Sequence, residues 1–309
     1  MSEDFDCARP FHALPSSNIA TVLDLSCTSG WGQTLHPDVL YVGEHSGGGW
    51  RYVMTITGFP YSNDYYENPE FVVSDDGIHW HLPEGGASPL IDYPNHVGYC
   101  YNSDPALFFE NGQYYIFYRD VRVFSDKAEV NLYFINSDDG LSWSNAHKVL
   151  SAQCSNSDTS RLLSPSVLRI DDNYVMWFVE RGQNGYCVHR LVSGDLHNLS
   201  DEETIVVING LRDKEYPWHI DVVRDGARLI MAFCTTGPKR SILFAESNDD
   251  GFTWNIFGNR IEPEKYALGG VELYKPSLCK DANNLWRLYY SAKLADGAWF
   301  SALIYLSEL

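Results

Sequence analysis

Short apolar segments separated by turn residues make up most of the chain. Val, Ile, Tyr, Phe and Trp, the residues that favour β-strands, dominate five of them: RYVMTITGF, QYYIFYRD, NYVMWFVER, ARLIMAFCT and LWRLYYSAK. No window of about a dozen residues carries an uninterrupted apolar stripe at helical spacing. The pattern therefore predicts an all-β protein.

Each of these five segments follows another apolar segment after a turn. The preceding strands contain HPDVLYV, DPALFFENGQ, SPSVLRIDDN, HIDVVRDGA and KPSLCKDANN. The connections ENGQ, IDDN, RDGA and DANN are rich in Asn, Asp and Gly, which close tight hairpins, and the first unit has a longer HSGGG insertion. Five hairpins thus recur along the chain.

A second landmark follows three of the hairpins, in VVSDDGIHW, INSDDGLSW and AESNDDGFTW. We interpret each Asp-Asp-Gly as the turn from a third strand to a fourth, with Trp80, Trp143 and Trp254 packing back on the sheet. A calcium-binding loop is the alternative, but these turns lack the other oxygen ligands of an EF-hand loop.

Four strands repeated at intervals of about 55–70 residues are typical of a β-propeller. We expect one domain over residues 1–309, a five-bladed β-propeller with four-stranded antiparallel blades starting near residues 36, 103, 163, 217 and 274. Residues 1–30 are expected to close the ring by pairing with the last blade, which removes open sheet edges.

In such a fold the starts of the innermost strands converge on the axis, and polar residues occupy these positions. We expect a central pocket there, lined by carboxylates and other polar side chains, with aromatic residues in the surrounding loops. The long loop GFPYSNDYYENPE is a further candidate for binding. The candidates for substrate binding are His36, Trp31, Tyr65, Arg119, Ser164, His219, Asp221 and Lys275.

Charge and cysteine content exclude several classes. Lys plus Arg number 22 and Asp plus Glu 41, a net charge of −19 that disfavours nucleic acid and anionic membranes as partners. The seven cysteines are scattered without a C-x-x-C pair, which argues against a zinc knuckle or a disulfide framework.

The start of the chain, MSEDFDCARPFHALPSS, has neither a basic leader nor an apolar stretch of signal-peptide length. We therefore expect a soluble protein without a signal peptide, cytoplasmic as the chain stands. A secreted or phage-associated protein is the alternative if the sequence has been trimmed. The oligomeric state is left open.

The hairpin repeat, the first-strand HPDVLYV, the second-unit SDPALFFENGQYYIFYR and the S-D-D-G-x-x-W turns resemble the five-bladed propeller glycoside hydrolases of families 43, 32, 117 and 130. In family 43 a first-blade Asp is the general base, a second-blade Asp tunes the acid, and a third-blade Glu is the acid. The resemblance implies these first two roles for Asp38 and Asp104.

The third unit begins Leu-Ser-Pro-Ser and offers no glutamate at the position of the acid. Glu180, at the end of the next strand, and Glu67, in the first unit, are the candidates instead. His219 is a further candidate, because a histidine acid is known among the family 117 relatives. An inverting mechanism needs the two groups about 6.5–9.5 Å apart.

We thus expect an enzyme that cleaves a glycosidic bond in an oligo- or polysaccharide. No cofactor or catalytic metal is required, and a structural calcium ion near His219 and its neighbouring carboxylates is the open alternative. Rival functions are a polysaccharide lyase, a glycoside phosphorylase and a carbohydrate-binding propeller without turnover.

Overall fold

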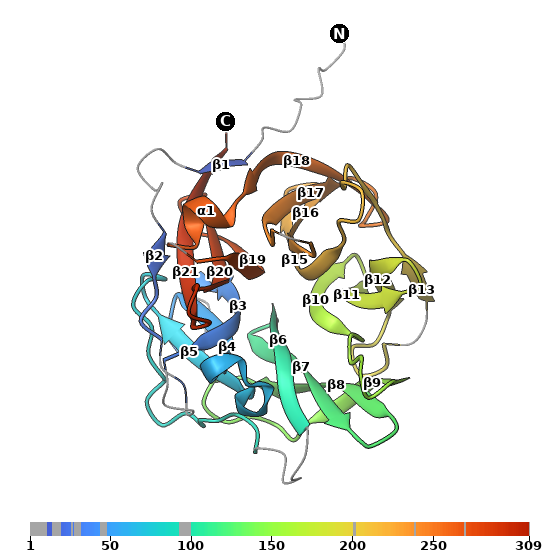
Figure 1. The fold of residues 1–309 in the computed structure, drawn as a ribbon. Helices are drawn as coiled ribbons and strands as arrows, with labels where there is room; N and C mark the ends of the chain where they lie inside the picture. The colour runs from blue at the N-terminus through green and yellow to red at the C-terminus, as the bar shows by residue number, and fades with distance from the viewer. Residues whose placement is uncertain are drawn as a thin grey trace.

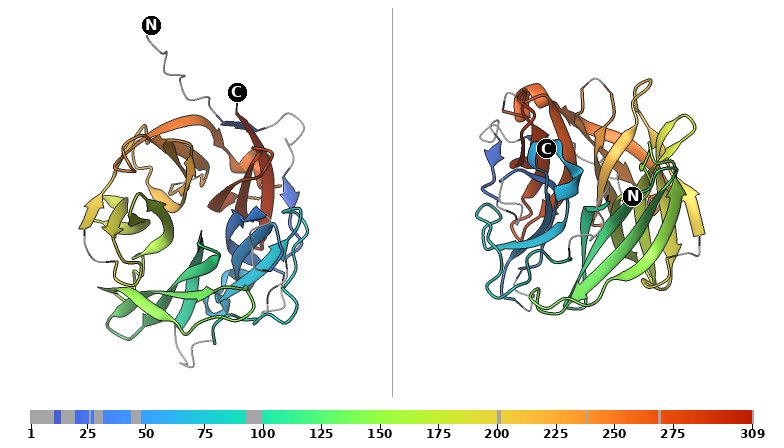
Figure 2. Two further views of the ribbon diagram at one scale, coloured as in Figure 1. Left: turned by 180° about the vertical axis from the view of Figure 1, so that it is seen from behind. Right: turned by 60° about the horizontal axis from the view of Figure 1, so that its bottom comes forward.

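Five antiparallel sheets stand around a common axis (Figure 1). The structure, a computed structural model, describes residues 11–13, 20–25, 27, 32–43, 48–92, 100–199, 202–237, 239–268 and 270–308. The ring is seen again from behind and at a tilt in Figure 2. The molecule is a five-bladed β-propeller, as the repeat of hairpins predicted.

The blades follow one another along the chain, and each begins with its innermost strand. The first blade contains β3 (Thr34–Tyr41), β4 (Tyr52–Gly58) and β5 (Pro69–Ser74). The second contains β6 (Cys100–Glu110), β7 (Gln113–Val123), β8 (Ala128–Ser137) and β9 (His147–Cys154). The third contains β10 (Leu163–Ile170), β11 (Asn173–Gly182), β12 (Gly185–Ser193) and β13 (Glu202–Ile205).

The last two blades take strands from outside their own unit. The fourth contains β15 (Pro217–Asp225), β16 (Arg228–Thr235), β17 (Ile242–Ser247) and β18 (Thr253–Ile261), with β14 (Val207–Asn209) parallel to β18. The fifth contains β19 (Glu272–Lys280), β20 (Trp286–Lys293) and β21 (Trp299–Glu308). Two segments from the other end of the chain, β1 (Phe11–Ala13) and β2 (Thr21–Val22), pair with β21.

Helical structure is confined to short turns in the part of the chain that is described. They are η3 (Pro60–Ser62), η4 (Asp64–Tyr66) and α1 (Pro263–Tyr266). None of the described helices is long and apolar enough to cross a membrane.

The outer parts of the blades match the sequence prediction with one exception. Only a single bridge, between Val73 and His81, stands where the first blade was expected to have a fourth strand. Trp80 and Trp254 are buried in the sheet packing. In the turn before Trp80, Oδ1 of Asp76 accepts hydrogen bonds from the backbone N–H groups of Ile78 and His79. These bonds give the aspartate a structural role.

A β-bulge interrupts every innermost strand near its start. In β3, for example, the register with β4 shifts between Leu35 and Asp38. Four of the bulge residues adopt the left-handed backbone region, at a cost of about 1–2 kcal/mol each for a side chain other than glycine. These residues are His36 (φ 56°), Asp104 (φ 49°), Ser164 (φ 46°) and Lys275 (φ 30°). The rest of each sheet holds this strained point in place, beside the axis.

Candidate active site on the propeller axis

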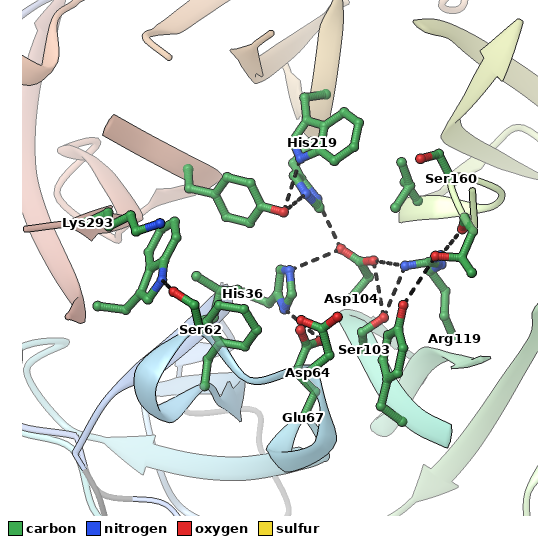
Figure 3. A pocket seen from close by; sticks show the side chains of 18 of the residues that line it. His36, Ser62, Asp64, Glu67, Ser103, Asp104, Arg119, Ser160, His219 and Lys293 are labelled. Atoms are coloured by element: carbon green, nitrogen blue, oxygen red, sulfur yellow. Dashed lines mark hydrogen bonds and ion pairs between the residues drawn. The ribbon is translucent and has the colours of Figure 1, made fainter. Parts of the chain in front are cut away.

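A pocket of about 410 Å³ opens at one end of the axis and receives side chains from all five blades (Figure 3). We call it the axial pocket. Bulge residues of the innermost strands form its floor, and loops between strands form its walls. Its lining comprises Leu35, His36, Phe59, Ser62, Asp64, Glu67, Tyr101, Ser103, Asp104, Arg119, Thr159, Ser160, Leu163, Trp218, His219, Arg240, Glu272, Tyr274, Lys293 and Trp299.

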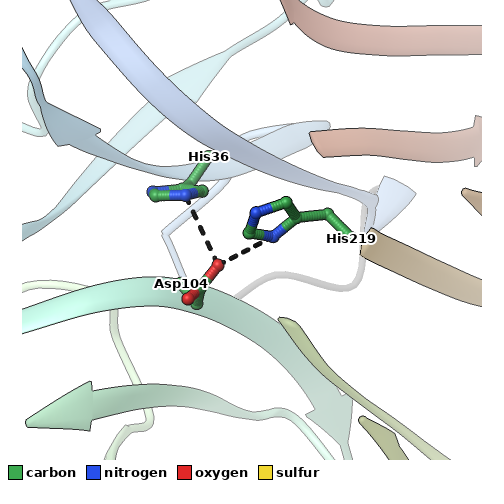
Figure 4. Close-up of side chains that lie close together, drawn as sticks. All are labelled: His36, Asp104 and His219. Atoms are coloured by element: carbon green, nitrogen blue, oxygen red, sulfur yellow. Dashed lines mark ion pairs between the residues drawn. The ribbon is translucent and has the colours of Figure 1, made fainter. Parts of the chain in front are cut away.

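Two histidines and one aspartate meet on the floor of the axial pocket (Figure 4). Oδ1 of Asp104 lies 3.0 Å from Nδ1 of His219 and 3.4 Å from Nε2 of His36. All three side chains are buried, and their three facing atoms lie within 4.8 Å of one another. Three separate blades thus bring one donor atom each to a single point.

Each member of this cluster has a further partner that fixes its orientation. Nδ1 of His36 lies 3.1 Å from the Thr57 hydroxyl. That hydroxyl can donate to the carbonyl of Leu35, so it can accept a hydrogen bond from the Nδ1–H group of His36. The lone pair on Nε2 of His36 then faces the cluster. Nε2 of His219 lies 2.5 Å from the Tyr274 hydroxyl.

Arg119 fixes the aspartate of the cluster from its other side. Its guanidinium donates a 2.5 Å hydrogen bond to Oδ2 of Asp104, and it also donates to the carbonyls of Thr159 and Arg161. Ser164 lies 2.6 Å from Nδ1 of His219 and 3.4 Å from Oδ1 of Asp104. Rotation of the Asp104 carboxylate would therefore break several hydrogen bonds.

Burial and charge set the protonation states of the cluster. Burial lowers the pKa of His36 to about 3, against the opposing effect of Asp104, and it also lowers the pKa of His219. Burial alone would raise the pKa of Asp104, but the charge of Arg119 and the hydrogen bond with His219 hold that pKa well below its ordinary value. The cluster therefore consists of two neutral imidazoles and one ionised carboxylate.

This donor set fits a divalent transition-metal ion. Neutral imidazole nitrogen and carboxylate oxygen are the ligands that zinc and its neighbours accept, and ligand atoms about 2.1 Å from such an ion lie about 3.4 Å apart in a tetrahedron. The distances of 3.0 and 3.4 Å between donor atoms are close to this value. The partners behind each ligand, Thr57, Tyr274 and Arg119, match the outer-shell hydrogen bonds that such sites use.

Glu67 stands on the wall of the same pocket. Its Oε2 is buried, has no hydrogen-bond partner among the described residues, and lies 3.7 Å from Nδ1 of His36. Burial, together with the negative charges of Asp64 and Asp104, raises the pKa of Glu67 well above its ordinary value. This carboxyl group is therefore suited to carry a proton at neutral pH.

Five residues that the sequence predicted for the site do line the axial pocket: His36, Glu67, Asp104, Arg119 and His219. Ser164 lies directly behind this lining, in contact with Asp104 and His219. The long loop of the first blade also contributes as expected, through Ser62, Asp64 and Glu67.

The expected pairing of Asp38 with Asp104 in one pocket is corrected by the structure. Asp38 lines a separate cavity of about 280 Å³ farther along the axis, which it shares with Asp221. We call this the lower axial cavity. Asp38 and Asp221 stand two residues beyond His36 and His219 on the same strands, so their side chains reach the axis at a different level.

Hydrogen bonds to neighbouring blades occupy both of these aspartates. Asp38 accepts from the N–H of Leu107 at 2.9 Å and from the hydroxyl of Ser277 at 3.1 Å. Asp221 accepts from the N–H of Leu278 at 2.6 Å. These bonds join the innermost strands of adjacent blades.

Lys275 was predicted to bind substrate, but it is buried between the two levels of the axis. It donates a 3.2 Å hydrogen bond to the carbonyl of Ile220. Its positive charge opposes the burial that raises the pKa values of Asp38 and Asp221. The lysine thus balances the two carboxylates of the lower axial cavity.

Two other predicted residues, Glu180 and Tyr65, are not in the lining of the axial pocket. Glu180 forms a 2.9 Å ion pair with Arg161 and is not among the lining residues. Tyr65 lies on η4 with 43% of its surface exposed, and it also stands apart from the lining. Trp31 lies outside the described residues.

Sequence reasoning missed Asp64, Tyr274 and Trp299, which line the pocket beside the residues it found. A signal for Tyr274 was present, because it directly precedes the bulge of its strand, as Leu35 and Ser103 do in their blades. Trp299 begins β21, a position that the repeat of hairpins did not mark.

Comparisons with known proteins support the fold. No family model matches the chain. A curated relative, the A type blood N-acetyl-alpha-D-galactosamine deacetylase of Flavonifractor plautii, is 26% identical over 273 residues, which are 74% of this chain but only 35% of that protein. Thus the chain spans about a third of the relative's length.

Solved structures extend the comparison. An N-acetylgalactosamine deacetylase from F. plautii, in complex with blood group B trisaccharide, superposes with a TM-score of 0.78 at 20% identity, covering 93% of this chain and 94% of that one. A family-43 (GH43) protein of Bacillus licheniformis gives a TM-score of 0.58 at 15% identity, over 95% of this chain and 54% of that one. The chain has the five-bladed fold of these carbohydrate-active proteins.

Proposed function

We propose that the protein is a metal-dependent amidohydrolase that removes the acetyl group from an N-acetylated amino sugar. The observation that carries the proposal is the cluster of His36, Asp104 and His219, three buried donor atoms in the protonation states that metal binding requires. The deacetylase activity of the relative from F. plautii supports the choice of reaction.

In this proposal His36, Asp104 and His219 hold the ion. When bound, a divalent metal ion polarises the amide carbonyl and lowers the pKa of a water molecule. Arg119, Thr57 and Tyr274 keep the three ligands in position through the hydrogen bonds described above. The aromatic walls, Trp218 and Trp299, exclude bulk water and pack against the sugar.

Glu67 moves the proton. Protonated at the start, it gives this proton to the amide nitrogen as the C–N bond breaks, and it regains a proton from the water that adds to the carbonyl carbon. One water is consumed, and the products are acetate and the free amino sugar. The buried, unpartnered oxygen of Glu67 and its raised pKa support this role.

Hydrolysis of a glycosidic bond is the second candidate, and one observation favours it. Glu67 has a raised pKa while nearby Asp104 has a lowered one, and a protonated acid beside an ionised carboxylate is the pairing that glycosidases use. The engagement of both Asp104 oxygens favours deacetylation, because neither oxygen is left to activate water.

The test is product analysis with controlled metal content. The chelator-treated protein is supplied with Zn²⁺, Mn²⁺ or Co²⁺ and incubated with methyl N-acetyl-α-galactosaminide, and acetate and reducing sugar are measured together. We expect acetate only, and only after metal is restored. Reducing sugar in place of acetate, insensitive to chelation, would replace this proposal with the glycosidase.

A further inference from the structure

A second cavity, of about 540 Å³, adjoins the axial pocket, and most of its lining comes from the second blade and the connection after β9. We call it the side cavity. Three of its lining residues, Asp64, Tyr101 and Thr159, also line the axial pocket, so the two spaces share a wall. The remaining lining is Val123, Phe124, Ser125, Asn156 and Ser157.

Neutral polar groups and aromatic rings make up most of this lining. Hydroxyl or amide groups come from Ser125, Asn156, Ser157 and Thr159, and Asp64 is the single charged residue that lines the cavity. The side chain of Phe124 lies in the connection after β7 with 45% of its surface exposed. Hydroxyl-binding groups beside an exposed ring suit a neutral sugar, because its C–H face packs on the ring while its hydroxyls form hydrogen bonds.

Hydrogen bonds fix the loops that carry this lining. The side-chain amide of Asn156 donates a 2.6 Å hydrogen bond to the carbonyl of Ser125, which joins the connection after β7 to the one after β9. Arg119, which grips Asp104, also donates to the carbonyl of Thr159 at 2.6 Å. Arg119 therefore holds both the shared wall, through Thr159, and the candidate metal ligand Asp104.

We propose that the side cavity is a second sugar subsite, which receives the neutral sugar linked to the N-acetylated sugar in the axial pocket. This inference rests on the proposed function. Each cavity alone has the size of a small-molecule site, about 300–1,000 Å³. The enzyme is thus built for an oligosaccharide, with its terminal N-acetylated sugar on the axis and the adjoining sugar against Phe124.

The experiment compares two substrates on the metal-loaded enzyme: methyl N-acetyl-α-galactosaminide and the type A blood-group trisaccharide, which carries the same terminal sugar. We expect a higher kcat/KM for the trisaccharide. Phe124→Ala lowers the ratio of the two kcat/KM values roughly 3–10-fold, through KM rather than kcat. The control is Phe252→Ala, which removes an equally exposed ring in the fourth blade and leaves the ratio unchanged.

Calorimetric titration of the chelator-treated protein with the same two saccharides distinguishes failure of the subsite proposal from failure of the proposed function. Acetate release from both substrates with a ratio that Phe124→Ala does not change would overturn the subsite and leave the proposed function standing. Without acetate from either substrate the proposed function fails, and the titration then decides the subsite. Trisaccharide binding weakened by Phe124→Ala supports it, and equal binding overturns it.

Discussion

Two levels of the propeller axis use the same innermost strands for different purposes. At the axial pocket His36, Asp104 and His219 point at one another and leave donor atoms facing a common point. Asp38 and Asp221 lie two residues beyond His36 and His219 on the same strands. Their carboxylates accept hydrogen bonds from backbone N–H groups of neighbouring blades.

The difference shows what separates a reactive carboxylate from a structural one in this fold. Both kinds are buried, so burial does not distinguish them. Asp104 is held by side chains that can exchange partners, namely an arginine and two histidines. Asp38 is held by a backbone amide and a serine, and its loss would separate blades instead of emptying a site.

The largest expected effect comes from Asp104→Asn. Loss of the carboxylate charge removes one ligand from the proposed ion, and we expect kcat/KM for acetate release to fall by about 10³-fold or more. The matched variant Asp38→Asn makes the same chemical change in the lower axial cavity. Its kcat/KM should stay within about tenfold of the wild-type value, because Asp38 does not line the axial pocket. An equal fall in kcat/KM in the two variants would contradict the different roles assigned to the axial pocket and the lower axial cavity.

Asp38→Ala should instead act on stability. It leaves the N–H of Leu107 without its acceptor and removes a counter-charge of Lys275, so we expect the free energy of unfolding to fall by about 3 kcal/mol. Urea unfolding measures this loss, with Ser277→Ala as a milder control expected near 1 kcal/mol. An unchanged unfolding midpoint would show that the lower level does not join the blades.

Tyr274→Phe probes the outer partner of His219. Removing the hydroxyl that lies 2.5 Å from Nε2 should weaken metal affinity by about 10–100-fold while excess metal restores activity. Tyr290→Phe is the control, because that buried hydroxyl donates to the carbonyl of Tyr266 and does not contact the cluster. Competition with a chelator of known affinity measures the metal affinity of each variant. Similar metal affinities in the two variants would argue against His219 as a metal ligand.

The smallest effect is a change in the pH dependence of stability. Burial and the charge of Asp38 raise the pKa of Asp221 from 3.8 to about 7. Between these values the folded state binds a proton that the unfolded state does not, so this group lowers stability as the pH rises through the window. Asp221→Asn should flatten that decline in metal-free protein, as measured by urea unfolding at pH 5 and pH 8. A parallel decline in the variant would contradict the raised pKa.

The sequence predicted the fold because its signals are local and repeated. Strand-rich hairpins, tight turns and Asp-Asp-Gly-Trp landmarks recur five, four and three times, and each can be seen without knowing the others. The site depends instead on the register of the bulge. The resemblance implied paired roles for Asp38 and Asp104, but Pro37 and Pro105 occupy equivalent places in their strands, so His36 is the first-blade residue that corresponds to Asp104.

Other parts of the site could not be predicted because they depend on the spatial neighbours of each blade. Glu180 carries the right group on the right strand, but Arg161 pairs with it away from the axial pocket. Trp299 comes from a strand of the fifth blade and reaches Ser62 in the first, where its indole N–H donates a 2.9 Å hydrogen bond. No spacing along the chain reports that contact.

The pairing of β2 with β21 has a consequence for how the protein is made. Thr21 faces Leu303 across this seam, so two segments synthesised about 280 residues apart must find each other. While a ribosome is still producing the middle blades, the early strands β1 and β2 have no partner to pair with. The ring can be completed only after β21 has emerged, which makes the last step of folding dependent on the strands β1 and β2.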